Sequence, residues 1–379
     1  MKKLNLKEIT LKEISKRANV AISTVSAVLN NSKNCFAGEK TRKKIIKIAE
    51  ELGYHPNLLS RSLKNGKTNT VGLIIPHLYY SLITLDVELL ESLLWEQGYH
   101  LFIGYTKNDQ KKEEDLIREF LSRRVDGIIF VIGKERQNKN KEIERIIDRQ
   151  YPFVTVGRFR NLRTDFVTTD FYNGGYKLAE HLYEMGYRNF GLVLGEDERY
   201  HPSIEERKKG FLDFLKKKNL AAKEYHLKDR EIAKAEDYVK DGELFAEDIL
   251  KNNHIPEAIF ASNDELALGI VKGAIKHRIK IPDELGIAGF DNSLSSILSP
   301  IPITTMRQKK EEIAKETFAA IMRKLEGKQS RIEKFVEPEL IKRVSTGIRP
   351  ESLHRDNPGP VEIENNKIGG VLWERKDLH

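Results

Sequence analysis

Residues 9–31 read ITLKEISKRANVAISTVSAVLNN, a stretch with two short helical patterns separated by a brief interruption. In the first pattern Leu11, Ile14 and Ala18 recur at helical spacing, so they form one apolar stripe. The run Thr10–Glu13 has the spacing of a capping box, in which two side chains cap the start of a helix. The sequence therefore predicts a helix that begins after Thr10.

A second short helix is predicted over Ile22–Leu29, with Val25, Val28 and Leu29 on its inner face. Asn19–Ala21 separates the two helices, and Asn is among the few residues besides Gly that accept a left-handed turn. Two helices joined by so short a turn match a helix-turn-helix. A plain three-helix bundle is the alternative.

A third helix is predicted over Glu39–Leu52, and it is expected to stop at Gly53, a typical C-terminal position. Its buried residues would be Ile45, Ile48, Ala49 and Leu52. The three helices together would form a small all-α unit.

Positive charge is concentrated in this part of the chain. The first 70 residues hold 15 of the 65 Lys and Arg residues but only 5 of the 57 Asp and Glu residues, a net charge of +10, whereas the remaining 309 residues carry −2. A compact basic unit on a nearly neutral body is expected of a protein that binds a polyanion. A solvated, Lys-rich surface is the alternative, but charge and turn length together favour DNA.

The chain is expected to fall into four segments. Asn57 can cap a two-turn helix over residues 57–64, but so short a helix is marginal alone and would form conditionally. The segments would be a helix-turn-helix headpiece (1–56), a hinge helix and linker (57–70), a body (71–346) and a C-terminal extension (347–379). The extension is rich in Pro, Gly and charge, so we expect it to lie on the surface or to be disordered, although residues 369–373 could add a strand.

The body alternates short apolar strands with amphipathic helices. Strands are predicted at 71–75, 99–104, 127–131, 153–156, 166–169, 190–194, 258–261 and 286–288. Helices are predicted at 82–97, 113–124, 173–185, 203–218, 236–252, 263–278 and 309–325. This pattern specifies parallel sheets with helices on both faces. A body of about 275 residues exceeds one comfortable sheet, so two α/β lobes are expected, with ligands at the carboxyl ends of the strands.

Several classes of protein are excluded. The longest uncharged apolar runs are far shorter than the roughly 20 residues that span a bilayer, and the N-terminus does not resemble a secretory signal, so a cytoplasmic protein without a membrane partner is expected. A single cysteine, Cys35, excludes an intrachain disulfide and a multi-cysteine metal site. The chain contains no G-x-S-x-G, P-loop, H-E-x-x-H or G-x-G-x-x-G motif, so no enzyme activity, cofactor or metal is predicted.

The combined pattern resembles one known family. The stretch at 9–31, its continuation TRKKIIKIAEELGYHPNLLSRSLKNGKT and the body segments VDGIIFV, GGYKLAEHLYEMGYRNFGLVLG, SNDELALG and IPDELGIAGFDN…PITTMRQ follow the order found in the lactose/galactose repressor (LacI/GalR) family of bacterial transcription regulators. Matches spaced from residue 9 to about 346 are more specific than any single motif. The resemblance implies a DNA-binding headpiece, a hinge helix and a two-lobed body like that of periplasmic sugar-binding proteins.

The resemblance also assigns DNA contacts. The second helix should insert its N-terminal end into the major groove, where base edges are distinguishable. Residues facing bases would be Ile22, Ser23 and Ala27. Residues approaching phosphates or bracing the helix would be Thr24, Ser26 and Asn30. Hinge contacts would come from Asn57, Ser60, Arg61 and Leu63, with Leu63 as a minor-groove wedge.

These assignments have structural alternatives. Ile22 could belong to the core, but Val20 and Val25 already supply the inner face, so exposure is favoured. Leu58, Leu59 and Leu63 of the hinge could pack on the body, although their spacing forms no single stripe.

A small-molecule effector is expected between the two lobes. By the resemblance, Arg207 would use its fork of donors on ligand hydroxyls or carboxylates, and Asp291 and Asn263 would face the ligand from strand ends. Arg158 and Tyr238 are further candidates. Asn263 could instead only cap the helix that follows, and Arg207 could lie in a solvated run of charges.

The chain departs from the family pattern at several positions. Ala21 stands where a capping Ser usually precedes the recognition helix, Asn19 replaces a turn Gly, and Gly38 replaces the Ser that caps the third helix. Ala27 stands where many members carry Arg. A frequent DxSNPFF motif is replaced by His77–Ile83, so no relative's effector can be carried over directly.

The leading hypothesis is a ligand-controlled transcription regulator, usually a repressor, that acts as a homodimer or larger oligomer on a near-palindromic double-stranded DNA operator. Its effector would be a sugar or sugar derivative. A cytoplasmic sugar-binding protein without a regulatory role is the alternative, and the first 64 residues argue against it. A sugar-modifying enzyme would need a catalytic constellation that the sequence lacks.

Overall fold

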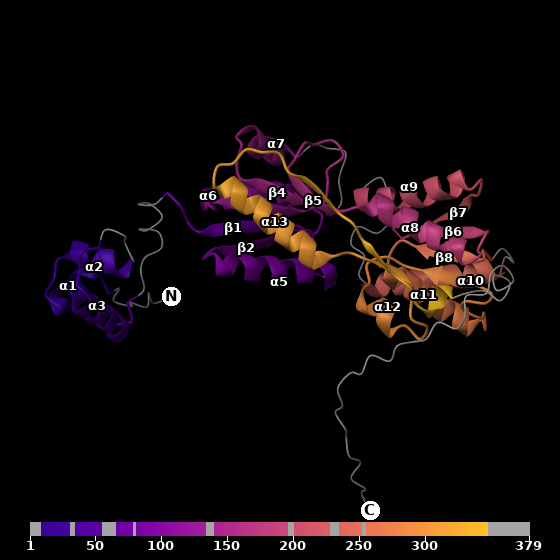
Figure 1. Cartoon of the computed structure of the whole chain (residues 1–379), viewed down its shortest axis with the longest axis horizontal. Coiled ribbons are helices and arrows are strands. Elements are labelled where there is room, and N and C mark those ends of the chain that lie inside the picture. Colours follow the sequence, from indigo (N-terminus) through magenta and orange to yellow (C-terminus); the bar gives the residue numbers. More distant parts are fainter. Residues whose placement is uncertain are drawn as a thin grey trace, which may run out of the picture.

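The computed structural model describes residues 9–30, 35–54, 66–78, 81–133, 140–195, 201–227, 235–251 and 255–347. Figure 1 shows a small helical headpiece and two α/β lobes in which helices flank the sheets, so the predicted fold class is confirmed. The predicted hinge helix at 57–64 and the C-terminal extension beyond residue 347 lie outside the described residues.

The headpiece consists of three helices, α1 (Leu11–Ala18), α2 (Ile22–Leu29) and α3 (Glu39–Glu51). Their predicted apolar stripes meet in one core, where Ile14, Val25 and Ile45 are fully buried. Asn19 takes the left-handed conformation between α1 and α2, with a φ of 57°. The sequence therefore predicted both the helices and the turn of the helix-turn-helix.

The helix N-termini of the headpiece differ from the prediction in one respect. Thr10 has the extended backbone of an N-cap residue, but its side chain makes no capping hydrogen bond, so the predicted capping box does not form. Ala21 precedes α2 and likewise makes no side-chain capping bond. The Ser15 hydroxyl instead donates to the Val20 carbonyl oxygen at 2.6 Å, which stabilises the turn. Core packing and this turn hold the headpiece together.

The first lobe is a six-stranded parallel sheet in the order β11-β5-β4-β3-β1-β2. Its strands are β1 (Thr70–Ile75), β2 (His100–Tyr105), β3 (Gly127–Val131), β4 (Phe153–Val156), β5 (Phe166–Thr169) and β11 (Glu333–Val336). Its helices are α5 (Ser81–Glu96), α6 (Gln110–Ser122), α7 (Lys141–Asp148) and α13 (Lys310–Leu325). Side chains alternate along a strand, so Leu73 packs with α5 and α13 on one face and Ile74 with α6 and α7 on the other.

The second lobe is a four-stranded parallel sheet in the order β7-β6-β8-β9. Its strands are β6 (Phe190–Leu194), β7 (Ala222–His226), β8 (Ala258–Ala261) and β9 (Gly286–Ala288). Its helices are α8 (Phe171–Glu184), α9 (Pro202–Lys217), α10 (Ala235–Lys251), α11 (Asp264–Lys276) and α12 (Leu294–Leu298). Leu192 packs with α8 and α9, and Val193 packs with α10 and α11 on the opposite face. An antiparallel pair, β10 (Thr305–Arg307) with β12 (Glu339–Ile341), completes the lobe.

The chain crosses between the lobes after β5, after β10 and after β11. These crossings contact one another: the Asp170 backbone N–H donates to the Val336 carbonyl oxygen at 2.9 Å, and the Thr169 hydroxyl donates to Gln308 Oε1 at 3.0 Å. As a result α13 and β11, which follow most of the second lobe in sequence, belong to the first lobe (Figure 1).

Six of the predicted strands have the predicted bounds, but among the described residues four strands and two α-helices were not predicted. The omitted elements are β7, β10, β11, β12, α7 and α12. The sheet-edge strands β7 and β11 read AKEYH and EKFV and leave polar side chains exposed, so they lack the apolar runs of central strands. β2, predicted as one of the short apolar strands, is likewise an edge strand and leaves several of its residues exposed.

Candidate functional site

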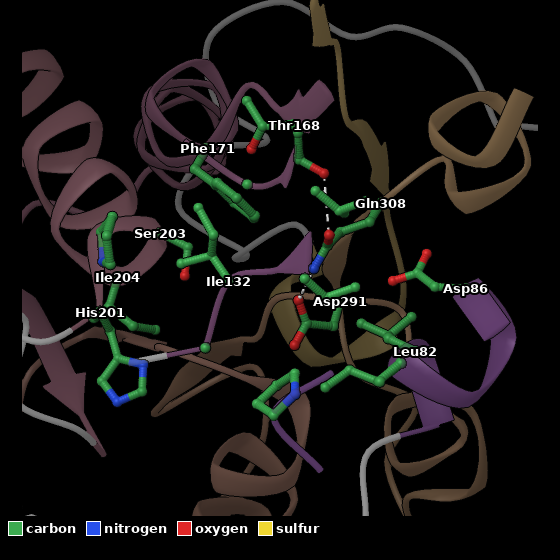
Figure 2. A pocket seen from close by; sticks show the side chains of 18 of the residues that line it. Leu82, Asp86, Ile132, Thr168, Phe171, His201, Ser203, Ile204, Asp291 and Gln308 are labelled. Carbon is green, nitrogen blue, oxygen red and sulfur yellow. Dashed lines mark hydrogen bonds between the residues drawn. The ribbon is translucent and has the colours of Figure 1, made fainter. Parts of the chain in front are cut away.

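A cavity of about 230 Å³ lies between the lobes, at the carboxyl ends of the parallel strands (Figure 2). Its apolar lining residues are Leu82, Ile83, Val131, Ile132, Val156, Phe171, Ile204 and Ile313. Its acidic and basic lining residues are Asp86, Arg158, Glu206, Arg207, Glu265, Asp291 and Lys310. The cavity lies where ligands collect in parallel α/β sheets, as predicted.

Arg207, on α9, is buried and held on several sides. Its guanidinium carbon lies 3.9 Å from the ring centroid of Phe290 and 4.8 Å from that of Phe171. Its Nη1 donates to the Ser262 carbonyl oxygen at 2.7 Å, and its Nη2 donates to Asp291 Oδ1 at 3.0 Å. The alternative of a solvated Arg207 is therefore wrong.

Asp291 lies just beyond β9 in a backbone conformation that residues other than Gly rarely adopt, with a φ of 111°. Its backbone N–H donates to the Met306 carbonyl oxygen at 2.8 Å, which holds this turn against β10. Its Oδ1 accepts from both Arg207 and Gln308, the latter at 2.6 Å. Because Gln308 also accepts from Thr169, a row of hydrogen bonds runs from α9 to the lobe crossings. Figure 2 shows the Asp291–Gln308 part of this row.

The three remaining predicted cavity residues have different positions. Asn263 lines the cavity, and its Oδ1 also accepts from the Leu266 backbone N–H at 2.8 Å, so it caps α11. Arg158 lines the cavity and pairs with Glu206, whose pKa is raised by burial. The prediction for Tyr238 is wrong: it is buried in the apolar core of the second lobe and does not line the cavity.

Several charged cavity residues were not predicted. Glu265 accepts from the Ser293 hydroxyl at 2.8 Å, and burial raises its pKa, with a further contribution from the nearby charge of Asp291. Asp86 and Lys310 form an ion pair in the cavity wall. The sequence signal that could have indicated Asp86 is an acidic residue among the apolar side chains near the start of the predicted helix over 82–97.

The candidate DNA-contacting face lies on α2. The exposed candidates are Ile22, Ser23 and Asn30, and the half-buried ones are Thr24, Ser26 and Ala27. Ile22 is 45% exposed, which confirms that it lies outside the core. The Asn30 side chain donates to the Ser26 carbonyl oxygen at 2.8 Å and so braces the end of the helix. Asn57, Ser60, Arg61 and Leu63 lie outside the described residues.

Within the described ranges, no cluster of His, Cys, Asp and Glu side chains is arranged to hold a metal ion. None of the helices in those ranges combines the length and the apolar character needed to span a bilayer.

Comparisons with known proteins agree with this geometry. A model of bacterial regulatory proteins of the lacI family matches residues 10–57, and a model of periplasmic binding protein-like domains matches 179–346. The HTH-type transcriptional regulator DegA of Bacillus subtilis is 31% identical over 339 residues, which cover 89% of this chain and 98% of DegA. The HTH-type transcriptional repressor PurR of Vibrio campbellii is 28% identical over 88% of this chain and 97% of PurR.

The headpiece and the two-lobed body define the class of DNA-binding transcription regulators. The chain belongs to the lacI family of bacterial regulatory proteins. Its fold is similar to that of the lac repressor dimer solved with operator and the anti-inducer ONPF, with a TM-score of 0.79 and 19% identity over 90% of this chain and 99% of that one. The family resemblance found in the sequence is thus confirmed.

Proposed function

We propose that the protein is a transcriptional repressor whose operator affinity is controlled by a sugar or sugar derivative bound between the lobes. The observation that carries this function is the hydrogen-bonded row from Arg207 through Asp291 and Gln308 to Thr169, which lines the cavity and reaches the lobe crossings. A ligand that bonds to this row would act on both lobes at once. It would shift the protein toward whichever lobe arrangement it binds more tightly.

The cavity suits a small ligand with an apolar face and several hydroxyl groups. Its volume of about 230 Å³ is below the roughly 300–1,000 Å³ of sites that hold drug-sized ligands. Arg207 and Asp291 offer donors and acceptors, and Asp291 Oδ2 makes no hydrogen bond among the described residues. Phe171 and Ile132 offer apolar surface in the same cavity, where Figure 2 shows them together with Asp291. Monosaccharides combine these features.

The active species would be a homodimer on a near-palindromic operator. Helix α12 exposes three large apolar side chains, of Leu294, Ile297 and Leu298, and Leu298 is 75% exposed. Apolar side chains gathered on one exposed helix are typical of an interaction surface. A dimer would present two copies of α2 to two half-sites of DNA.

Sedimentation velocity of the protein should therefore give about twice the mass of one chain. A monomer at micromolar concentration would contradict the dimer.

DNA contacts would come from the headpiece (1–56) and the hinge (57–70), while residues 71–346 hold the ligand. In the headpiece Ile22, Ser23 and Ala27 would face bases, with Thr24, Ser26 and Asn30 near phosphates. In the hinge the contacts would come from Asn57, Ser60, Arg61 and Leu63. The apolar Leu63 would enter the minor groove and help to kink the duplex.

Replacing Ala27 with Arg should change the sequence preference of the protein. Ala27 offers only a methyl group to a base, and Ile22 is also apolar, which leaves Ser23 as the hydrogen-bonding side chain among the three base-facing candidates. An Arg can bond a guanine through two hydrogen bonds, worth about 1–3 kcal/mol of discrimination. Ala27→Arg should therefore raise the affinity for operators with guanine opposite residue 27 about 10-fold more than for others. Selection of binding sites from random DNA measures this, and a strong guanine requirement in the unaltered protein would refute it.

The function itself is tested with the full chain and DNA that flanks its own gene. Gel-shift titrations should show sequence-specific binding whose Kd changes when a sugar that stabilises the protein is added. Binding of the sugar without any DNA binding would instead support a sugar-binding protein with no regulatory role.

A further inference from the structure

Asp86 on α5 and Lys310 at the start of α13 form a buried ion pair in the cavity wall. Asp86 Oδ2 and Lys310 Nζ are 2.8 Å apart, and the two side chains are only 2% and 9% exposed. Both residues line the cavity. Figure 2 shows the Asp86 carboxylate facing the same interior as Asp291 and Gln308.

Each partner has hydrogen-bonding capacity that the described residues do not use. Asp86 Oδ1 is buried and has no hydrogen-bond partner among them. Lys310 Nζ carries three N–H donors, and in the described part of the chain its hydrogen bond is the one to Asp86. Leaving a buried polar group unsatisfied is costly, so the pair is incomplete as a purely structural element.

Stability does not explain why these residues occur here. Burial raises the pKa of Asp86, because desolvation of the carboxylate outweighs the attraction of Lys310. Apolar side chains in place of a buried ion pair are often neutral or stabilising. Lys310 also occupies the first position of α13, where the positive end of the helix dipole disfavours a cation. Two locally unfavourable residues at one point of the cavity wall indicate a role in binding.

The charge balance of the cavity limits what can bind beside this pair. Each Lys and Arg side chain of the described lining is matched by a carboxylate, in the pairs Lys310–Asp86, Arg207–Asp291 and Arg158–Glu206. Glu265 adds a further carboxylate to the lining. This excess of acidic groups would repel an anionic ligand. It would not repel an uncharged ligand.

We propose that Asp86 and Lys310 form a ligand-binding subsite for an uncharged group with a hydrogen-bond donor next to an acceptor. The donor would bond to Asp86 Oδ1, and the acceptor would take an N–H of Lys310. Vicinal hydroxyls of a polyol have this chemistry, as do the adjacent N–H and C=O of a lactam. The subsite belongs to the first lobe and Arg207 to the second, so one ligand bonded to both would bridge the lobes. This inference rests on the proposed function only in placing the ligand in the same cavity.

The test replaces both partners in the full chain. The Asp86→Leu/Lys310→Met variant removes the pair without leaving a lone buried charge, so it should remain folded. Thermal shift and calorimetry would use D-xylose, D-ribose, D-glucose and D-galactose as polyols, hypoxanthine and uracil as lactams, and D-gluconate and glucose 6-phosphate as anions. We expect at least one uncharged probe to stabilise the unaltered chain, and its Kd to rise about 10- to 100-fold in the variant.

The matched control removes another ion pair of the same helix. Glu316 on α13 pairs with Lys334 on β11 at 3.1 Å, away from the cavity, so Glu316→Leu/Lys334→Met should leave the Kd of that probe unchanged. The inference is wrong if the Asp86/Lys310 variant binds as the unaltered chain does, if an anionic probe binds best, or if no uncharged probe binds. An uncharged probe that binds through the subsite but leaves DNA binding unchanged would instead contradict the proposed regulation.

Discussion

A chain shortened to residues 65–379 should show no measurable operator binding, whereas the full chain should bind operator DNA with an affinity that falls steeply with salt. The headpiece has its own core around Ile14, Val25 and Ile45, and all of the net positive charge comes from the first 70 residues. Each phosphate contact releases counterions, so the affinity of the full chain should fall about 10³-fold or more between roughly 50 and 200 mM salt. Fluorescence anisotropy with labelled operator measures both effects.

The shortened chain serves as its own control for folding. It keeps both sheets and the cavity, so a sugar that stabilises the full chain should raise its melting temperature equally. Operator binding that survives the removal of residues 1–64 would contradict the assignment of DNA contacts to the headpiece and hinge.

Arg207→Ala and Asp291→Ala should each abolish the response to ligand and leave operator binding without ligand intact. The two side chains form one charge-assisted pair in the cavity wall, and removal of either would cost about 1.5–3 kcal/mol of ligand binding for each hydrogen bond lost. The ligand Kd should therefore rise about 10- to 100-fold or more, which calorimetry measures. Because the headpiece folds around a separate core, the DNA affinity without ligand should change less than about twofold.

Arg160→Ala is the matched control for this pair. Arg160 forms an ion pair with Glu205 at 2.7 Å, but it does not line the cavity. Its replacement should leave the ligand Kd within about twofold of the unaltered value, since an exposed ion pair contributes little. A normal ligand response in both the Arg207 and the Asp291 variants would show that the ligand binds elsewhere.

The cavity shows which of the predicted effector-site residues the fold brings together. Arg207, Asp291, Asn263 and Arg158 all line it, because the family pattern reflects chain positions that the fold brings to the space between the lobes. Tyr238 was misplaced, because a tyrosine on an amphipathic helix can turn either to a core or to a cavity, and the sequence does not distinguish these. The role of the hinge residues lies outside what the structure describes.

The sequence by itself determined the elements whose signals are local. The helices of the headpiece and six of the strands follow from apolar periodicity, and the turn at Asn19 follows from the backbone freedom of that residue. The alternation of strands and helices was enough to predict parallel sheets, and the length of the body was enough to predict two lobes. The helices, the strands and the turn each depend on residues within about one element of one another.

Only the tertiary structure decided which distant segments meet. It assigns α13 and β11 to the first lobe, since three crossings pass side by side and let late elements complete an early sheet. It also brings Asp86 and Lys310 together, although they are 224 positions apart in the chain. No local sequence pattern predicts such an ion pair. The free energy of the pair depends on burial and on a partner residue that comes close only when the whole body has folded.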